Sequence, residues 1–338
     1  MTKKYLMNGF GPGFLLDAFQ KYIPEYEYTY YQPKSWRYDF INNYLHLKKM
    51  RLQGKLAEFD VLHCSIWSNM TNMVPKKNQI GISHWHGFSL GVNSKNALSD
   101  SNRFNQLLGK TLNPLVEKRI REAIQKYTLI YAAIPNVLAE LKKIREDAVW
   151  LPNPINTELF SPHGDKVKME GEPAIFFPTR FHKMKTPEIG MKIFDDIKKS
   201  FPQAKLHLIR YPNRFSQYGY YREVLHKYKS DIVWHDFIPR EQLPSLYRSF
   251  DLVIGSFGKG LLNLVELEAM ACKTAVVSYD NYEFIKKDIS ELPGLALKLL
   301  ESKTFKNSYV QNAFEYVCEV HSQEKVAQQH RKNLSKNY

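Results

Sequence analysis

The sequence lacks several features that would place it quickly in a structural class. No stretch of about 18 uncharged apolar residues occurs, so no transmembrane helix is predicted. The cysteines, Cys64, Cys272 and Cys318, form neither a C-x-x-C pair nor a metal-ligand spacing with histidine, so we expect them to be reduced and structural. No low-complexity tract suggests a disordered tail, and the N-terminal apolar stretch is too short for a signal peptide. These absences predict a soluble, cytoplasmic protein.

Acidic residues are scarce relative to basic ones, and the imbalance is uneven along the 338 residues. The net charge is +14, and residues 1–150 hold 21 basic against 12 acidic side chains, a net +9 that leaves +5 for the rest. An anionic partner is therefore expected for the first half. The charge is not gathered into a recognised nucleic-acid motif, so no nucleic-acid partner is expected.

Short apolar runs alternate with longer amphipathic stretches, a pattern typical of parallel α/β sheets. The length favours two domains, and a polar, proline-rich segment at 151–172 separates two series of strands. The predicted strands are Lys4–Met7, Val61–Cys64, Gln79–His84, Leu129–Ala133, Val149–Leu151, Ala174–Pro178, Lys205–Arg210, Ile232–His235, Asp251–Ile254 and Thr274–Tyr279. We assign residues 1–153 and 154–315 to the two domains, and 316–338 to a C-terminal helix that packs back toward the first.

The stretch from Asp251 to Ser278 is the most informative. A buried strand leads into a glycine-bearing loop and then into a helix that carries Glu266 and Glu268. Backbone amides in such a loop and at a helix N-terminus suit a diphosphate, because they supply directed donors and the positive end of the helix dipole. The alternative is an ordinary strand-to-helix turn with solvated glutamates.

A second stretch, from Ile175 to Glu188, is a strand that ends in Arg180 and is followed by Lys183 and Lys185. A guanidinium and an ammonium group together can neutralise a leaving diphosphate. A solvated basic loop is the alternative when this stretch is taken alone.

Together the two stretches resemble glycosyltransferase family 4 of the GT-B superfamily, and the resemblance extends over most of the chain. Arg180 and Lys185 match the family's G-R-L-x-x-x-K-G loop, with Thr179 and Thr186 in place of its glycines. Further segments resemble family motifs in the family's order: residues 151–160, 233–253 and 264–277. In the last of these, Lys273 stands where the family motif L-L-E-A-M-A-x-G-x-P-V-V has glycine.

The resemblance implies a GT-B architecture, with two Rossmann-like parallel-sheet domains facing across a cleft. The first domain is then the acceptor side and the second binds the nucleotide sugar. It also implies transfer of a hexose from a nucleotide-diphosphate sugar to a hydroxyl acceptor, with retained configuration (EC 2.4). From the basic first domain we expect the acceptor to be a lipid-linked or cell-surface glycan precursor. No further cofactor is expected.

The resemblance assigns roles to particular residues. Arg180 and Lys185 would stabilise the departing diphosphate, and Glu268 would orient the nucleotide ribose. His86, within Ile82–Phe88, resembles the family's strand-to-loop H-G element near the transferred sugar, and residues 8–13 resemble its glycine-rich first loop. The predicted donor-binding residues are Gly11, Gly13, Arg180, Lys185, Gly258, Lys259, Gly260, Leu261, Leu262 and Glu268.

Two departures from common patterns shape the expected chemistry. The first of the family's two glutamates falls on Gly260, which leaves the donor sugar open. A D-x-D carboxylate pair, which metal-dependent transferases of the other major fold need, is absent from the sequence, so we expect metal independence. The alternatives are a GT-B nucleotide-sugar epimerase or hydrolase, and a catalytically inactive sugar-nucleotide-binding protein.

Residues 34–55 suggest how an acceptor held at a membrane could be reached. Phe40, Tyr44 and Leu47 recur at helical spacing beside a set of basic residues. The basic residues are Lys48, Lys49, Arg51 and Lys55. Aromatic and basic side chains in this pattern favour peripheral contact with anionic lipid. The alternative is that the same apolar residues pack the helix on the first sheet.

Overall fold

The computed structural model describes residues 2–9, 14–31, 39–65, 69–86, 118–182, 185–211, 219, 221–257, 262–279 and 288–337. For residues 39–43 the backbone alone is described. The chain divides into two compact units. The N-terminal unit comprises Met1–Pro154 and Gln323–Tyr338, and the C-terminal unit comprises Ile155–Ser322.

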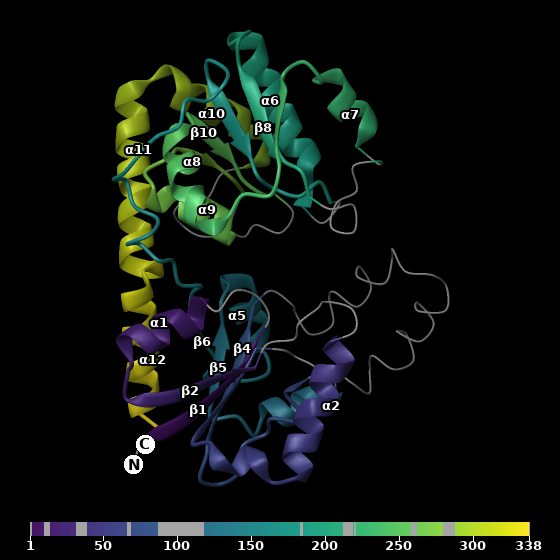
Figure 1. Cartoon of the computed structure of the whole chain (residues 1–338), viewed down its shortest axis with the longest axis vertical. Helices are drawn as coiled ribbons and strands as arrows, with labels where there is room; N and C mark the ends of the chain where they lie inside the picture. The colour runs from purple at the N-terminus through teal and green to yellow at the C-terminus, as the bar shows by residue number, and fades with distance from the viewer. Residues whose placement is uncertain are drawn as a thin grey trace. The chain divides into compact units, whose positions relative to one another are not determined.

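A parallel sheet of six strands, in the order β2-β1-β3-β4-β5-β6, forms the centre of the N-terminal unit (Figure 1). The strands are β1 (Lys3–Asn8), β2 (Tyr26–Tyr31), β3 (Val61–Cys64), β4 (Ile80–Trp85), β5 (Leu129–Ala132) and β6 (Val149–Trp150). The helices whose two ends both lie among the described residues are α1 (Phe14–Tyr22), α2 (Asp39–Leu52), α5 (Pro135–Lys142) and α12 (Gln323–Ser335). A 3-10 turn spans Lys55–Glu58. Every residue of β3, β4 and β5 is buried, as expected for parallel strands covered on both faces.

The second strand was not predicted from the sequence. β2 reads Tyr-Glu-Tyr-Thr-Tyr-Tyr and pairs in parallel with β1, with Lys3 opposite Tyr26. Tyrosine and threonine favour strands, and β2 lies at the edge of the sheet, where alternate side chains remain partly exposed. The predicted sheet therefore lacked one edge strand.

The C-terminal helix α12 belongs to the N-terminal unit, although 168 residues of the other unit precede it in the chain. It lies beside α1 (Figure 1), and Arg331 binds both carboxylate oxygens of Glu25 at 2.8 and 2.6 Å. From the inner face of α12, His330 enters the core and stacks on Phe19, with ring centroids 4.2 Å apart.

His330 begins a chain of buried hydrogen bonds through the core of this unit. The hydroxyl of Tyr5 lies 3.0 Å from His330 Nε2 and 2.7 Å from His63 Nδ1. His63 Nε2 lies 3.3 Å from His84 Nδ1, and His84 Nε2 lies 3.3 Å from the Leu151 carbonyl. The three imidazoles are fully buried. Among the described residues, no group of three or more His, Cys, Asp or Glu side chains is arranged to hold a metal ion.

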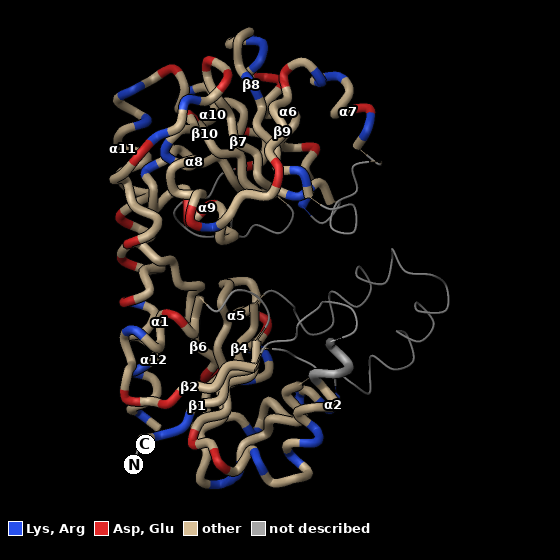
Figure 2. Tube along the Cα trace, viewed as in Figure 1, with Lys and Arg blue, Asp and Glu red and all other residues tan. Residues whose placement is uncertain are grey.

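The exposed apolar side chains of helix α2 are not those that were predicted to face a membrane. Leu47 is fully buried, so the alternative, packing on the unit, is correct for this residue. The exposed apolar side chains near the end of α2 are instead Leu45 and Leu52, which are 52 % and 78 % exposed. Lys48 and Lys49 are exposed between them, and Figure 2 shows basic residues along the last turns of the helix. No helix in the described part of the chain is long and apolar enough to cross a membrane.

The C-terminal unit holds a second parallel sheet, in the order β11-β10-β7-β8-β9. Its strands are β7 (Ala174–Phe177), β8 (Lys205–Ile209), β9 (Ile232–His235), β10 (Leu252–Ile254) and β11 (Val276–Val277). Its helices are α6 (Pro187–Ser200), α7 (Arg222–Lys227), α8 (Leu243–Ser249), α9 (Leu264–Ala271), α10 (Leu292–Glu301) and α11 (Lys303–Tyr316), with short 3-10 turns at Arg240–Gln242 and Ile289–Glu291 and a π-helical turn at Val317–His321. The predicted α/β class with two parallel sheets is confirmed.

Helix α6 approaches its sheet closely because it has a glycine at the contact. A Cβ atom on Gly190 would lie 2.4 Å from Cζ of Phe177, the last residue of β7. Both Phe177 and its neighbour Phe181 are buried in the apolar core of this unit. The close contact fixes the start of α6 relative to the end of β7, where the predicted basic loop lies.

Candidate functional site

The predicted basic loop and the predicted phosphate helix meet within the C-terminal unit. The ammonium group of Lys185, which precedes α6, donates to Oδ1 of Asn263 at 2.8 Å. Asn263 is the N-cap residue of α9. The carbonyl of Lys185 also accepts from the amide of Phe257 at 3.3 Å. A cation is therefore held beside the positive end of a helix dipole, an arrangement that suits an anionic ligand.

Arg180 lies at the exposed end of the same loop. Its neighbour Phe181 is buried and makes an edge-on contact with Tyr221, with ring centroids 5.5 Å apart. The loop closes with a hydrogen bond from the amide of Lys185 to the carbonyl of His182 at 2.7 Å. One aromatic anchor thus holds the start of the loop in the core, beside a guanidinium at the surface.

The end of the loop has an unusual backbone. Thr186, the N-cap of α6, has φ 42° and ψ 58°, in the left-handed region that favours glycine. The other non-glycine residue with positive φ in the described chain is Lys273, at 55°. Lys273 follows α9 in a Schellman turn, with Thr274 N donating to Ala269 O at 3.0 Å. Both residues stand where the resembling family has glycine, so the backbone keeps a glycine conformation without the glycine.

Glu266 is a structural residue and not a solvated one. It is 1 % exposed, and Oε1 accepts from the amide of Ser256 at 2.7 Å, while Oε2 accepts from the amide of Asn263 at 3.0 Å. With Asn263 it forms a capping box at the start of α9. One carboxylate therefore ties together the residues on both sides of the glycine loop. The Asn263-x-x-Glu266 spacing is a capping signature that the sequence interpretation overlooked.

Glu268, the predicted ribose ligand, is buried and already engaged. Its Oε1 lies 2.9 Å from Nη1 of Arg240, and Oε2 accepts from the hydroxyl of Tyr247 at 3.3 Å. Burial raises the pKa of Glu268 to about 7, and the nearby Arg240 guanidinium opposes that rise. Arg240 itself lies over the ring of Phe160, 4.9 Å from its centroid. A ribose hydroxyl would have to share the carboxylate with these partners.

His86 lies at the end of β4 in the N-terminal unit and is exposed. Its Nδ1 lies 3.1 Å from Oδ1 of Asn153, an acceptor, so Nδ1 carries the proton and Nε2 is left as an acceptor. The surrounding protein atoms lower the pKa of His86, so the ring is neutral at pH 7. The ring can therefore accept a hydrogen bond from a sugar hydroxyl. Asn153, which sets this tautomer, was not predicted.

Part of the predicted site cannot be placed. Gly11 and Gly13, and likewise Gly258, Lys259, Gly260 and Leu261, lie outside the described residues. Leu262, the next residue, is 2 % exposed, so its side chain belongs to the core. In the C-terminal unit the structure brings together Lys185 and the start of α9, and it pairs Glu268 with Arg240, 28 residues earlier in the chain.

Several solved structures have a fold similar to that of this chain over nearly its whole length. Sucrose-phosphate synthase from Thermosynechococcus elongatus superposes with a TM-score of 0.74 at 16 % identity, covering 99 % of both chains. HepE from Anabaena, with UDP and glucose, gives a TM-score of 0.66 at 14 % identity and the same coverage. A glycosyltransferase from Rickettsia africae gives 0.66 at 11 %, covering 99 % of this chain and 98 % of its own. The fold is GT-B.

A protein-family model also matches part of the C-terminal unit. Residues 163–292 match the family described as Glycosyl transferases group 1. The matched segment contains the basic loop, the capping box and Glu268, all within the C-terminal unit of the GT-B fold. No curated protein sequence matches the chain at a significant level.

Proposed function

We propose that the chain is a retaining glycosyltransferase that moves a hexose from a nucleotide-diphosphate sugar to a hydroxyl acceptor. The observation that carries the proposal is the contact between Lys185 and Asn263, which joins a cation to the N-terminus of α9. The group 1 match over residues 163–292 and the GT-B fold support it. So does a GT-B relative: HepE from Anabaena has been solved with UDP-glucose.

In the proposed reaction the acceptor hydroxyl attacks the anomeric carbon from the face that the diphosphate leaves. The bond between the anomeric carbon and the phosphate oxygen breaks as the new glycosidic bond forms, and the hydroxyl proton passes to the departing phosphate. Arg180 and Lys185 stabilise the charge that develops on the diphosphate. His86 accepts a hydrogen bond from the sugar through Nε2, and no residue of the chain acts as a nucleophile. Fixed cations in this role make a divalent metal unnecessary.

The test is product formation with UDP-, GDP- and ADP-sugars, after thermal-shift screening has identified the nucleotide that stabilises the chain. Arg180→Ala and Lys185→Ala should each lower turnover by at least about a hundredfold, the usual scale for removing one preorganised stabiliser of charge. Lys192→Ala, an exposed lysine on α6, is the matched control and should be neutral. Turnover should also survive EDTA.

Each alternative function has its own outcome in this assay. Nucleotide binding without product would indicate an inactive sugar-nucleotide-binding protein. Free sugar or an epimerised donor, formed without an acceptor, would indicate a hydrolase or an epimerase. Near-normal turnover in both loop variants, or loss in EDTA that Mg²⁺ or Mn²⁺ restores, would overturn the proposed roles of Arg180 and Lys185.

We further propose that the acceptor is held at an anionic membrane, which α2 contacts through Leu45 and Leu52 with Lys48 and Lys49 between them. These side chains lie three, four and seven residues apart, so they share one exposed face of the helix. Apolar groups on such a face enter the headgroup region, while each lysine contributes roughly 1 kcal/mol near an anionic surface.

Sedimentation with neutral and anionic vesicles tests this contact. We expect binding to anionic vesicles alone, weakened by high salt, by Lys48→Glu/Lys49→Glu and by Leu45→Ser/Leu52→Ser. Lys76→Glu/Lys77→Glu makes the same charge change at an exposed site of the same unit and should bind as the wild type does. Equal partitioning of all four proteins would show that α2 is not the contact.

A further inference from the structure

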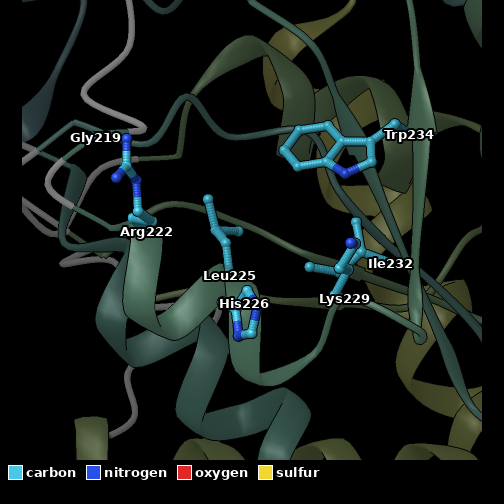
Figure 3. A pocket seen from close by; sticks show the side chains of 7 residues that line it. All are labelled: Gly219, Arg222, Leu225, His226, Lys229, Ile232 and Trp234. Carbon is cyan, nitrogen blue, oxygen red and sulfur yellow. The ribbon is translucent and has the colours of Figure 1, made fainter.

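A pocket of about 340 Å³ lies on the C-terminal unit between α7 and the edge strand β9 (Figure 3). The residues that line it are Gly219, Arg222, Leu225, His226, Lys229, Ile232 and Trp234. Figure 3 shows side chains from α7 and the turn after it on one side, with Trp234 across from them. β9 has no neighbour on its outer side among the described strands, so the pocket is at the margin of the sheet.

The charge of the pocket is positive. Among the described residues, Arg222, His226 and Lys229 line it and no carboxylate does. On the elements that support it, Asp195 is paired with Lys199 and Lys227, and Asp231 is paired with Lys198 and Lys205. Glu223, on α7 beside Arg222, is exposed and does not line the pocket. Within the described chain, the side chains of Arg222, His226 and Lys229 make no ion pair. The described lining of the pocket therefore carries positive charge and no negative charge.

The aromatic component is Trp234. It is 37 % exposed, on the side of β9 that it shares with Ile232. The guanidinium of Arg210 lies 5.8 Å from the ring centroid, and its Nη1 lies 3.6 Å from Oδ1 of Asp236. Its neighbour His235 points the other way, where it lies 2.8 Å from His207. An exposed indole in a strand gives a flat, rigid apolar face at low cost in side-chain entropy.

We propose that this pocket binds one anionic sugar unit, a pyranose that carries a carboxylate or a phosphate, in the glycan acceptor. The inference rests on the proposed function, because it places a second contact with the acceptor on the unit that binds the donor. The C–H face of the pyranose stacks on Trp234, and its anionic group binds Arg222 and Lys229 through charge-assisted hydrogen bonds. The volume, near the lower end for small-molecule sites, suits one or two sugar rings.

The same features fit a nucleotide or a nucleic acid less well. Nucleotide phosphates usually bind converging backbone amides at a helix N-terminus, whereas this pocket offers separate side-chain charges. Single-stranded nucleic acids need successive aromatic platforms along a basic groove. The described residues that line this pocket include one indole, Trp234, and one smaller ring, the imidazole of His226, but no further aromatic side chain.

Isothermal titration of the full chain with tetragalacturonic acid, a carboxylated tetrasaccharide, tests the proposal. Maltotetraose, its neutral counterpart, should bind at least about tenfold more weakly. Trp234→Ala should weaken binding of tetragalacturonic acid at least about tenfold, and Trp234→Phe should restore most of it. Arg222→Gln/Lys229→Gln should abolish the salt-dependent part, while Lys332→Gln/Lys336→Gln, at exposed sites of the other unit, should have no effect.

Four results would overturn the inference: no binding of tetragalacturonic acid to the wild type, equal binding by Trp234→Ala, equal binding of maltotetraose, or equal binding of inorganic phosphate. A DNA tetranucleotide that bound more tightly than the saccharide would instead make this a nucleic-acid surface. The titration needs no turnover, so its outcome is separate from that of the proposed function. Absent product with intact saccharide binding would reject the transferase and leave the pocket assignment standing.

Discussion

Lowering the pH from 8 to 5 should destabilise the N-terminal unit strongly, because its core holds three fully buried imidazoles. Burial lowers the pKa of His330 to about 3 and lowers those of His63 and His84 well below the ordinary value. In the unfolded chain each histidine has a pKa of about 6.5. The unfolded state therefore binds more protons below pH 6.5, and the stability present above that pH falls as the pH falls toward the folded-state pKa values.

The hydrogen bonds explain why the folded chain resists protonation. The Leu151 carbonyl can only accept, so His84 donates from Nε2 and must accept at Nδ1 from His63. His63 then accepts at Nδ1 from the hydroxyl of Tyr5, which leaves that oxygen to accept from Nε2 of His330. Each neutral ring thus has one defined N–H. An added proton on His63 or His84 would place two donors face to face or reverse the chain of hydrogen bonds. Nδ1 of His330 lies 3.1 Å from the hydroxyl of Tyr131, so burial alone opposes a second proton on that ring.

The size of the effect follows from the unfolded-state pKa. At pH 5 the protonation of one histidine with a pKa of about 6.5 stabilises the unfolded state by about 2 kcal/mol. The three buried residues give about 6 kcal/mol, as large as the whole stability of many domains, about 5–15 kcal/mol. His86, whose pKa is lowered as well, adds to the same loss. The C-terminal unit should respond less. There, the raised pKa of Glu268 stabilises the unit as the pH falls through the range in which Glu268 takes up its proton. This gain opposes the loss from the buried His207 and the half-buried His235.

The free energy of unfolding of the N-terminal unit can be measured by urea unfolding, followed by tryptophan fluorescence in a Trp234→Phe background. In that background the remaining tryptophans all precede residue 155. His330→Gln keeps a donor and an acceptor but cannot titrate, so the loss between pH 8 and 5 should shrink by about 2 kcal/mol. Stability that does not vary from pH 8 to 5, or equal slopes for His330→Gln and wild type, would refute the buried neutral chain.

The backbone of the C-terminal unit gives the remaining predictions, each measured by urea unfolding of that unit. Thr186→Gly should stabilise it by about 1–2 kcal/mol, because it relieves a left-handed β-branched residue whose buried hydroxyl has no hydrogen-bond partner in the described chain. A loss of stability in Thr186→Gly would show that the backbone at Thr186 is not strained. Lys273→Gly should stabilise the unit less, since it also loses the contact between the Lys273 ammonium group and the Phe314 ring at 4.8 Å. Gly190→Ala should cost about 1–3 kcal/mol through its overlap with the buried Phe177 ring, and a neutral result would mean that α6 can move away from β7.

Strands with a continuous apolar run were predictable from sequence because their composition alone identifies them. Val61–Cys64 and Ile232–His235 have the predicted bounds, and other apolar runs shifted by one or two residues at their ends. The strand predicted at Thr274–Tyr279 shortens to Val276–Val277. β2 escaped because its signal is tyrosine and threonine at an edge, where burial on one side leaves no continuous apolar run. A strand is therefore predictable where it contains a continuous apolar run, at the centre of a sheet or, as in β9, at its edge, and β2 contains no such run.

For the site residues, the sequence predicted local motifs but not the contacts between distant segments. Lys185 and the start of α9 were predicted from local motifs, and the fold brings them into contact. The pairing of Glu268 with Arg240 could not be read from sequence, because it depends on how a turn after β9 packs over α9. A motif identifies which carboxylate is present, whereas its protonation and its partners are set by residues distant in the chain.

The departures from the family pattern are of two physical kinds, and they lead to different expectations. Thr186 and Lys273 replace glycines, yet both adopt the left-handed backbone that glycine would provide, so the substitutions cost stability and preserve the shape of the loop and the helix end. Gly260 replaces a carboxylate, and no backbone conformation can supply the missing charge and acceptor oxygens. Restoring glycine at the first two positions should therefore alter unfolding and leave the preferred donor unchanged, whereas Gly260→Glu should change which sugar is transferred.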